Sequence, residues 1–510
     1  MTGVQTCALP ILQRLRADAT DAQVVRVDLK ISSLPGVLPS PVPDGVQSVS
    51  VTVSGITTYF WFDVHHDAQG LGILAETDQL TVTGHSLGGH LAGLAARLFP
   101  DLFDQAVLFN AAGFDPLTSL KLTDQIVDLF GTVLSAQGQS LPGSSFAGLP
   151  IFNLEAEDSA PGDDLNIVAS LITGIPAGVI EDIRTENNSH SMDQMMDALG
   201  VLSLLEKLNP LMSMQQIFTL YDALTNQSGD TEETLLEKLS RLFLFNDAPL
   251  EPVAAGLISH GDFSLRSANH ERLLQLEAVI MNQGYVLESI TRISQEELVA
   301  NARHSLAWSY ALKELNPFVI TNADALYTAH NQNHALEVHD ATNNPAGLLT
   351  EQYLEDRAQL LALIIKRNLE DLPNDENITH GYDDKYYQDM DQNLVIMPGG
   401  YNELTAERVV FGADGATDIL TGGNRDDHLF GQGGDDVLIG GNGMDYLEGG
   451  EGEDVLDGRE DAISVAHGAA SDILNGGQGF DTYLPGLGDR IVDSDGQGRI
   501  YVHDQYLNLS

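Results

Sequence analysis

The spacing of apolar and polar residues divides the chain into zones with different periods. Between residues 12 and 200, short β-branched runs alternate with helical segments. Between residues 201 and 373, apolar residues recur every three or four positions, as in TLLEKLSRLFLF, RLLQLEAVI and YLEDRAQLLALIIKRNL. The first zone predicts an α/β domain, the second a mainly helical region, and the polar segment 374–410 a connector. The strand candidates of the first zone are 79–83, 105–110 and 151–154.

A period of nine takes over in residues 411–495. Glycines fill the start of each unit, an Asp stands at its sixth position and a Leu follows two residues later, giving GGxGxDxLx. A flexible glycine-rich linker would not keep Asp and Leu in so strict a phase. The register resumes after an insertion, and the repeating aspartates are Asp418, Asp427, Asp436, Asp445, Asp454, Asp472 and Asp481.

The chemistry of this repeat points to calcium. Its glycine-rich half allows a tight turn with positive φ, whose carbonyl oxygens face a neighbouring turn. The Asp carboxylate completes an oxygen cage suited to Ca²⁺, which takes roughly six to eight oxygen ligands. The x-Leu-x half predicts a short strand with its Leu pointing inward. Calcium ligands are therefore predicted at the repeating aspartates and at Gly431, Gly433, Gly440 and Gly449.

The repeat resembles the RTX nonapeptide family, whose members fold as a parallel β-roll on calcium. The resemblance implies a secreted, extracellular bacterial protein that leaves the cell through a type I secretion apparatus. It also implies a strand-rich cap after the repeats, and residues 496–510 are expected to form a C-terminal strand or cap that is itself truncated. Without calcium, the crowded carboxylates are predicted to keep the repeats unfolded.

The charge of the chain agrees with this interpretation. The 510 residues include 74 acidic and 24 basic ones, for a formal net charge of −50. Such a chain repels nucleic acid, which we exclude as a partner, and anionic membranes. Residues 411–495 alone hold 19 Asp or Glu and three Arg. A single cysteine, Cys7, forbids an internal disulfide, so metal is the expected source of extracellular stability.

A second motif lies in QLTVTGHSLGGHLAGLAARLF. Gly84-His85-Ser86-Leu87-Gly88 follows an apolar, β-branched run and precedes an apolar helical pattern. This context predicts a strand, a tight turn and a helix, which together expose a nucleophilic serine hydroxyl. We expect the two glycines to let strand and helix approach closely around Ser86.

The stretch GHSLGGHLA resembles the lipase branch of the α/β-hydrolase fold, which requires the chain order Ser, acid, His. The acid should follow a strand, and IFNL leads into EAEDSAPGDDL. Asp164 fits the family's pattern best, with Asp163 and Asp158 as alternatives. His190 follows the next strand candidate, IEDIRTE, and is the expected base.

The resemblance implies acyl transfer. His190 would take the proton of Ser86 while Asp164 orients the imidazole, and the backbone N–H of Leu87 would donate to the oxyanion. The family's second oxyanion donor follows an earlier strand, and the residues from Leu12 to His85 show no convincing strand and donor segment. We therefore expect an N-terminally truncated hydrolase domain at 12–200, and the fragment is expected to be impaired.

Residues 1–11, MTGVQTCALPI, resemble an in-frame translation of a sequencing-library adapter. They lack the basic and apolar regions of a signal peptide. We expect this segment to be an artefact and the native N-terminus to be missing.

A helical pattern within 110–149 places Leu122, Ile126, Leu129 and Val133 on one face. Two interpretations stay open for it. The helix could be a lid that opens on a lipid surface, or it could pack permanently on the sheet.

Two functions from different classes follow. The first is a serine ester hydrolase acting on lipid or ester substrates, as a triacylglycerol lipase or a phospholipase A1. The second is a calcium-dependent surface or adhesion protein with an inactive hydrolase-like domain. The intact GHSLG and the position of His190 favour the first.

Overall fold

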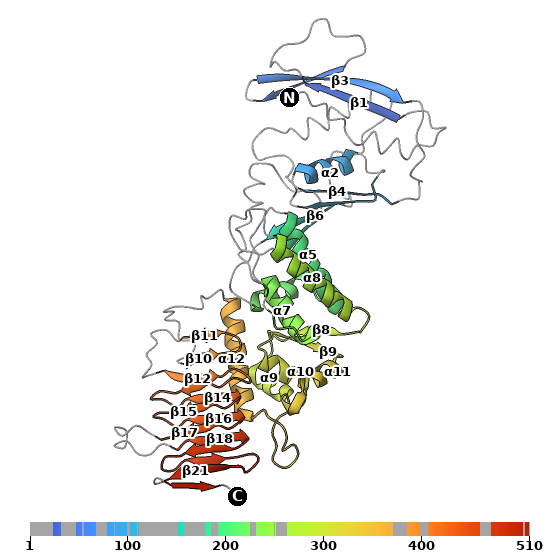
Figure 1. Cartoon of the computed structure of the whole chain (residues 1–510). Helices are drawn as coiled ribbons and strands as arrows, with labels where there is room; N and C mark the ends of the chain where they lie inside the picture. The colour runs from blue at the N-terminus through green and yellow to red at the C-terminus, as the bar shows by residue number, and fades with distance from the viewer. Residues whose placement is uncertain are drawn as a thin grey trace. The chain divides into compact units, whose positions relative to one another are not determined.

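The chain divides into two compact units, Met1–Gly200 and Val201–Ser510, which are described separately (Figure 1). Within the described residues, no helix is both long and apolar enough to cross a membrane. The computed structural model describes residues 24–31, 47–53, 56–67, 79–85, 87–98, 103–109, 111, 151–157, 179–184, 192–224, 231–248, 250, 263–370, 385–397, 406–459, 471–502 and 505–508.

The first unit contains a four-stranded parallel sheet in the order β4-β5-β6-β7. Its first three strands confirm the strands predicted near residues 79, 105 and 151. Helix α2 (Leu87–Leu98) follows β4 and contacts β4 and β5, and the buried Ala92, Ala95 and Ala96 let it lie close to the sheet. The strands are β4 (Thr81–His85), β5 (Gln105–Phe109), β6 (Ile151–Glu157) and β7 (Val179–Arg184).

A separate antiparallel sheet precedes it, in the order β1-β3-β2. The sequence pattern showed no convincing strand and donor segment in this part of the chain. The structure has strands here, but they pair with one another and not with β4. They are β1 (Val24–Ile31), β2 (Gln47–Val53) and β3 (Ile56–Asp67).

Helices open the second unit, in the zone where the apolar spacing predicted them. The division between the two units falls inside α5, and α5 to α8 pack with the antiparallel strand pair β8–β9 around one apolar core. Tyr310 and Phe318 are buried in this core. The bounds are α5 (Met192–Leu208), α6 (Met214–Leu224), α7 (Thr231–Leu244), α8 (Phe263–Ile280), β8 (Val286–Ser289) and β9 (Phe318–Thr321).

The remaining helices lead to the repeats. Thr350 begins α12 because its hydroxyl accepts a hydrogen bond from the N–H of Tyr353, and Ser294 begins α9 with a full capping box. The helices are α9 (Gln295–Ala302), α10 (Leu306–Lys313), α11 (Asp324–His330), the short 3₁₀ helix η1 (Gln332–His334) and α12 (Glu351–Leu369).

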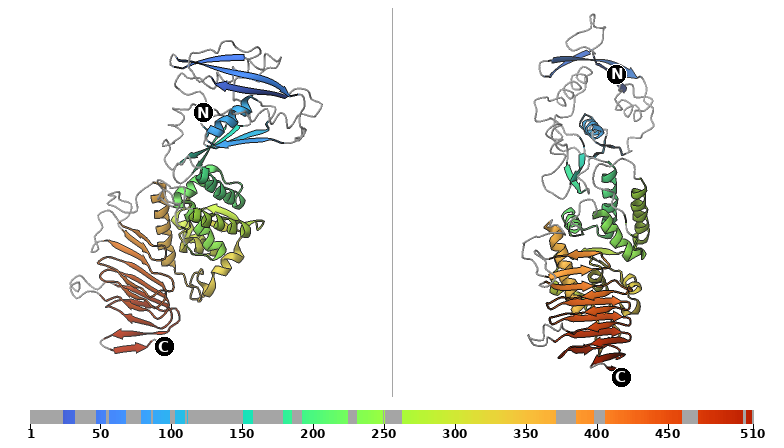
Figure 2. Two further views of the ribbon diagram at one scale, coloured as in Figure 1. Left: turned by 45° about the horizontal axis from the view of Figure 1, so that its top comes forward. Right: turned by 60° about the vertical axis from the view of Figure 1, so that its left-hand side comes forward.

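The C-terminal strands wind into two sheets, and we call the region from Lys385 to Asn508 the roll (Figure 2). Successive strands of the repeats alternate between the sheets. The first sheet has the order β11-β10-β12-β14-β16-β18-β20 and the second β13-β15-β17-β19-β21-β22. Among the described strands of the roll, only β11 and β22 run antiparallel to the strands beside them.

The first sheet contains β10 (Lys385–Asp389), β11 (Leu394–Ile396), β12 (Glu407–Phe411), β14 (His428–Gly433), β16 (Tyr446–Glu451), β18 (Ile473–Gln478) and β20 (Arg490–Val492). The second contains β13 (Ile419–Thr421), β15 (Val437–Ile439), β17 (Val455–Asp457), β19 (Asp481–Leu484), β21 (Gly498–Val502) and β22 (Gln505–Asn508). Strands β10 and β11 lie inside 374–410, which the sequence assigned to a connector, so the first sheet starts before the repeats do.

The leucines of the repeat stack between the two sheets, as predicted. Leu429 pairs with Leu447, and Leu447 pairs with Leu474, in the first sheet. In the second sheet Leu420, Leu438 and Leu456 form a second column of the same kind. All are 0–1% exposed, so each coil buries two leucines and contributes to one continuous core.

Helix α12 covers the outer side of the first sheet and shares a core with it. Tyr353 of α12 meets the rings of Phe411 and Phe430 edge-on, at centroid distances of 5.6 and 5.5 Å. Apolar residues of α9, α10, α12 and the first sheet form a single cluster. Arg357 of α12 pairs with Asp389 of β10, and both side chains are buried.

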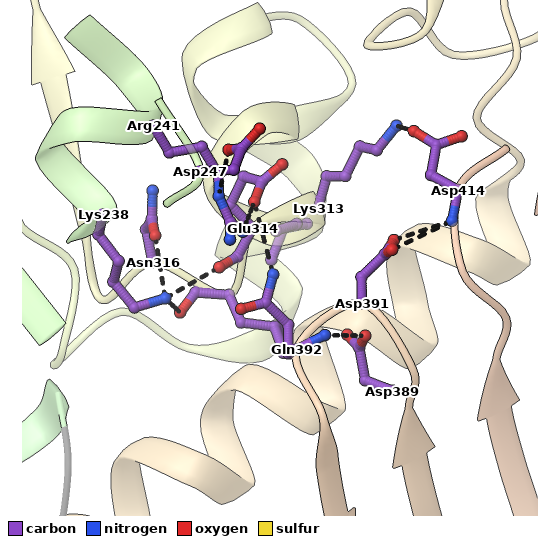
Figure 3. A network of polar contacts seen from close by, with 12 residues as sticks. Lys238, Arg241, Asp247, Lys313, Glu314, Asn316, Asp389, Asp391, Gln392 and Asp414 are labelled. Carbon is purple, nitrogen blue, oxygen red and sulfur yellow. Dashed lines mark hydrogen bonds and ion pairs between the residues drawn. The ribbon is translucent and has the colours of Figure 1, made fainter. Parts of the chain in front are cut away.

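A polar network joins the helices to the first coil of the roll (Figure 3). Lys238 Nζ donates to the carbonyls of Glu314 and Leu315 at 3.0 and 3.2 Å, and burial lowers the pKa of this lysine to about 8. Glu314 also accepts from Arg241, and Lys313 pairs with Asp414 at 3.0 Å. Because Asp414 lies in the turn after β12, helix α10 is tied to the roll by an ion pair.

Candidate calcium-binding site

The repeating aspartates form two columns, one along each edge of the roll. In each column, Oδ1 of an Asp accepts a hydrogen bond from the backbone N–H of the Asp one coil earlier. The distance is 2.9 Å from Asp427 N to Asp445 and 2.8 Å from Asp436 N to Asp454. We call Asp427, Asp445, Asp472 and Asp489 ladder A, and Asp418, Asp436, Asp454 and Asp481 ladder B.

The second carboxylate oxygen has a different environment. Oδ2 of Asp436, Asp445 and Asp454 is buried and has no hydrogen-bond partner among the described residues. The three side chains belong to residues that are 0–2% exposed. A buried, unpartnered carboxylate oxygen is costly, so these oxygens require a cation or a proton.

The pKa values show the same cost. Burial raises the pKa of Asp436 to about 6, of Asp454 to about 7 and of Asp445 to about 8. Neighbouring aspartates of the same ladder add to the rise. Removal of this charge repulsion needs a positive charge inside the turns.

The first glycine of each repeat makes room for that charge. A Cβ at Gly431 would overlap Oδ2 of Asp436 and would lie 2.5 Å from the carbonyl oxygen of Gly449 in the next coil. A Cβ at Gly449 would overlap Asp454 in the same way and lie 2.7 Å from the carbonyl oxygen of Gly476. A carboxylate oxygen from one coil and a carbonyl oxygen from the next therefore converge at Gly431 and Gly449, and in the same way at Gly422.

This arrangement fits calcium bound mainly by backbone oxygens. In the part of the chain that the structure describes, no group of three His, Cys, Asp or Glu side chains could hold a metal ion. A calcium ion, which takes roughly six to eight oxygens, must then use carbonyls of the glycine turns beside the ladder carboxylates. Hard oxygen donors without nitrogen or sulfur suit Ca²⁺ better than a transition metal.

The predicted glycines do not all lie in this position. Gly431, Gly440 and Gly449 each lie against a ladder aspartate. Gly433 does not, because a Cβ there would first meet Oδ1 of the exposed Asp414, at 3.0 Å. The sequence analysis missed the equivalent first glycines Gly412, Gly422, Gly458 and Gly476, although Gly422 and Gly476 stand five residues before a ladder Asp.

Two further residues continue the columns of the roll, Asp489 in ladder A and Tyr483 in the leucine column of the second sheet. Oδ1 of Asp489 accepts from the N–H of Asp472 at 3.1 Å, which makes it the next member of ladder A. The nine-residue period does not reveal Asp489, because Asp489 follows Asp472 by 17 residues and not by 18. Tyr483 stands at a leucine position of the second sheet, and its hydroxyl donates to Asp493 at 3.0 Å.

The insertion lies within one half-coil. Partners in the first sheet are 18 residues apart from His428 to Tyr446 and 27 apart from Tyr446 to Ile473. Asp472 therefore occupies the position directly after Asp454 in the winding. The roll continues past the insertion without a break in either ladder.

Comparison with known families agrees with this geometry. The RTX calcium-binding nonapeptide repeat matches residues 413–445, 439–462 and 468–491. The chain carries RTX repeats. These repeats bind Ca²⁺, and they are typical of proteins secreted by the type I route. No curated protein and no solved structure matches the chain.

The candidate hydrolase residues lie mostly outside the described part of the chain. Ser86, His190, Asp164 and its alternatives Asp163 and Asp158, together with the possible lid helix, fall outside the described residues. Leu87 is the first residue of α2.

The backbone around Ser86 has the predicted order, with β4 ending at His85 and α2 beginning at Leu87. A Cβ at Gly84 would overlap the carbonyl of Gly88 and lie 2.7 Å from the N of Gly89. A Cβ at Gly89 would lie 2.7 Å from Cβ of Ala111, whereas one at Gly88 would meet nothing within 4 Å. The strand therefore approaches the helix at the backbone of Gly88, as the sequence suggested, but the positions that leave no room for a side chain are Gly84 and Gly89.

Proposed function

We propose that the protein is an exported serine ester hydrolase acting on lipids, a lipase or a phospholipase A1, with a calcium-folded RTX roll. The observation that carries this proposal is that β4 ends at His85 and α2 begins at Leu87, so that Ser86 alone separates strand from helix. A side chain at Gly84 would overlap the backbone of Gly88, and one at Gly89 would overlap Ala111. A strand and a helix that approach so closely on either side of one serine are typical of nucleophile elbows.

The sheet topology supports the order of the proposed triad. Strands β4, β5, β6 and β7 are adjacent and parallel, so their carboxyl ends lie at one edge of the sheet. Ser86 follows β4, the candidate acids lie in the segment between β6 and β7, and His190 comes after β7. All three segments leave the sheet at that shared edge.

In the proposed reaction, His190 removes the proton from the Ser86 hydroxyl as its oxygen attacks the ester carbonyl. Asp164 orients the imidazole and stabilises its positive charge. The backbone N–H of Leu87, at the N-terminus of α2, donates to the oxyanion. The alcohol leaves with the proton from His190, and water then hydrolyses the acyl-enzyme.

The RTX roll supports the proposed location. Its buried carboxylates repel one another without calcium, so the roll would stay unfolded in a calcium-poor cytoplasm and pass through a type I secretion apparatus. Outside the cell, calcium would fold it.

A fluorophosphonate probe tests the proposed nucleophile, because labelling requires an activated serine and not complete turnover. We expect calcium-loaded protein to be labelled and Ser86→Ala to lose the label. Ser305→Ala is the control, since Ser305 makes no capping hydrogen bond and should leave labelling unchanged. Absence of label on protein whose circular dichroism shows the folded roll would favour a calcium-dependent surface protein instead. Esters of different chain length, including phospholipids, then separate lipase from phospholipase A1.

A further inference from the structure

Ladder A begins with an arginine where every later rung has an aspartate. The register of β12 and β14 pairs Val409 with His428, so Arg408 stands opposite Asp427. The backbone N–H of Arg408 donates to Oδ1 of Asp427 at 2.6 Å. Asp427 N–H donates to Asp445 in the same way. Arg408 therefore occupies the ladder position of a calcium-binding Asp, with the opposite charge.

The guanidinium binds the carbonyls of the turn below it. Arg408 Nη1 donates to the carbonyl oxygen of Thr421 at 3.0 Å and lies 3.4 Å from that of Gly422. Gly422 is the first glycine of its repeat. In the following coils, the carbonyl oxygen of a first glycine lies beside the first glycine of the preceding coil, where a ladder carboxylate also lies. The carbonyl oxygen of Gly440, for example, lies beside Gly422, next to which Oδ2 of Asp427 is found.

The surroundings hold this cation at the end of the ladder. Arg408 Cζ lies 5.6 Å from the centroid of the Tyr386 ring, and Tyr386 is its partner in β10. A carbonyl oxygen of Thr421 and the ring of Tyr386 thus both lie beside the guanidinium, which keeps its charge next to the first rung of ladder A.

We infer that the Arg408 guanidinium is a built-in cation that closes ladder A in place of a calcium ion. The chain itself neutralises the first turn, and calcium sites of ladder A begin between Asp427 and Asp445. The first coil, already joined to α12 through the shared core, then offers a partly neutralised template on which calcium orders the following coils.

Calcium alone is the probe, with the full chain and two readouts. Equilibrium dialysis gives the number of ions bound, and far-UV circular dichroism gives the calcium concentration at half-folding. Arg408→Gln should raise the calcium concentration at half-folding about threefold or more without adding a calcium site. The variant loses the charge-assisted hydrogen bonds of the guanidinium, and this free-energy cost is divided among the several calcium ions that fold the roll. Arg408→Asp should bind one more calcium ion than the wild type, since it restores the ladder carboxylate.

Arg425→Gln is the matched control, because Arg425 is an exposed arginine in the turn between β13 and β14 of the next coil. It should leave both readouts unchanged. The inference fails if Arg408→Gln folds at the same calcium concentration as Arg425→Gln. It also fails if folded Arg408→Asp binds no additional ion. Neither result depends on hydrolase activity.

Discussion

At the scale of single residues, the two oxygens of each ladder Asp have separate roles. Oδ1 accepts a hydrogen bond from a backbone N–H of the preceding coil and so fixes the register of neighbouring coils. Oδ2 faces the first glycine and, in Asp436, Asp445 and Asp454, finds no partner among the described residues. Register therefore comes from the protein, whereas neutralisation has to come from calcium.

The two glycines of one turn test this division. Gly431→Ala would push a methyl group onto Asp436 Oδ2, so we expect the calcium concentration at half-folding to rise about tenfold or more. Gly433→Ala meets only the end of the exposed Asp414 side chain and should change it less than about threefold. Circular dichroism titration measures both. Equal effects of the two variants would show that the first glycine has no special place.

A pH dependence follows from the raised pKa values. Unfolded carboxylates titrate near pH 3.9, whereas those of Asp436 and Asp445 in the calcium-free roll titrate at about 6 and 8. The folded roll binds more protons in this window, so its stability falls as pH rises from about 4 to 8. In EDTA, far-UV circular dichroism should therefore show more folded roll at pH 5 than at pH 8, where the roll is expected to be unfolded.

With calcium present the sign reverses, because protons compete with the ion for the same carboxylates. The calcium concentration at half-folding should then rise as the pH is lowered below about 7. A calcium-free roll that is more stable at pH 8 than at pH 5 would contradict the buried, unneutralised state of the ladders.

At the scale of elements, the nine-residue period was sufficient to predict the roll, since Asp and Leu recur in one phase and each has one environment. The strands β10 and β11 could not be predicted this way, because KYYQD and LVI lack the repeat. They join the sheet only through pairing, β10 with β12 and β11 with β10. The helices α7, α8 and α12 followed from apolar residues at three- and four-residue spacing. The roles of Gly89 and Arg408 depend on a neighbouring strand or coil and have no signature in the local sequence.

The elbow between β4 and α2 offers a contrast between glycines. Gly84→Ala would overlap the backbone at Gly88, so we expect it to lower the melting temperature of the first unit or prevent its folding. Gly88→Ala meets nothing within 4 Å and lies in a helix, where Ala is favoured over Gly by about 1 kcal/mol. Calorimetry in calcium should show it unchanged or stabilised. If Gly88→Ala were the more damaging variant, the turn geometry would be different from that described.

The contact between α12 and the first sheet depends on a buried ion pair. Asp389→Asn leaves the Arg357 charge buried without its partner, and should cost about 3 kcal/mol of unfolding free energy. Glu351→Gln, in the exposed pair with Arg303, should change stability little. Denaturant unfolding at saturating calcium compares the two. A loss for Asp389→Asn no larger than that for Glu351→Gln would argue against a tight contact here.

At the scale of the whole second unit, helices and roll are not independent. Tyr353 and Leu361 of α12 lie in one apolar cluster with Phe411 and Phe430 of the roll. Calcium that folds the roll therefore also completes the core of the helices. Loss of calcium should expose one side of α12 and loosen α9 and α10 as well.

Hydrogen exchange of the full chain, with calcium and in EDTA, tests this account most directly. Segment-resolved mass spectrometry would follow the roll strands β12–β19 and helix α12 (Glu351–Leu369) in the same sample. We predict that both are protected with calcium and lose protection together in EDTA. The account is contradicted if the roll strands stay protected in EDTA, or if α12 keeps its full protection while the roll unfolds.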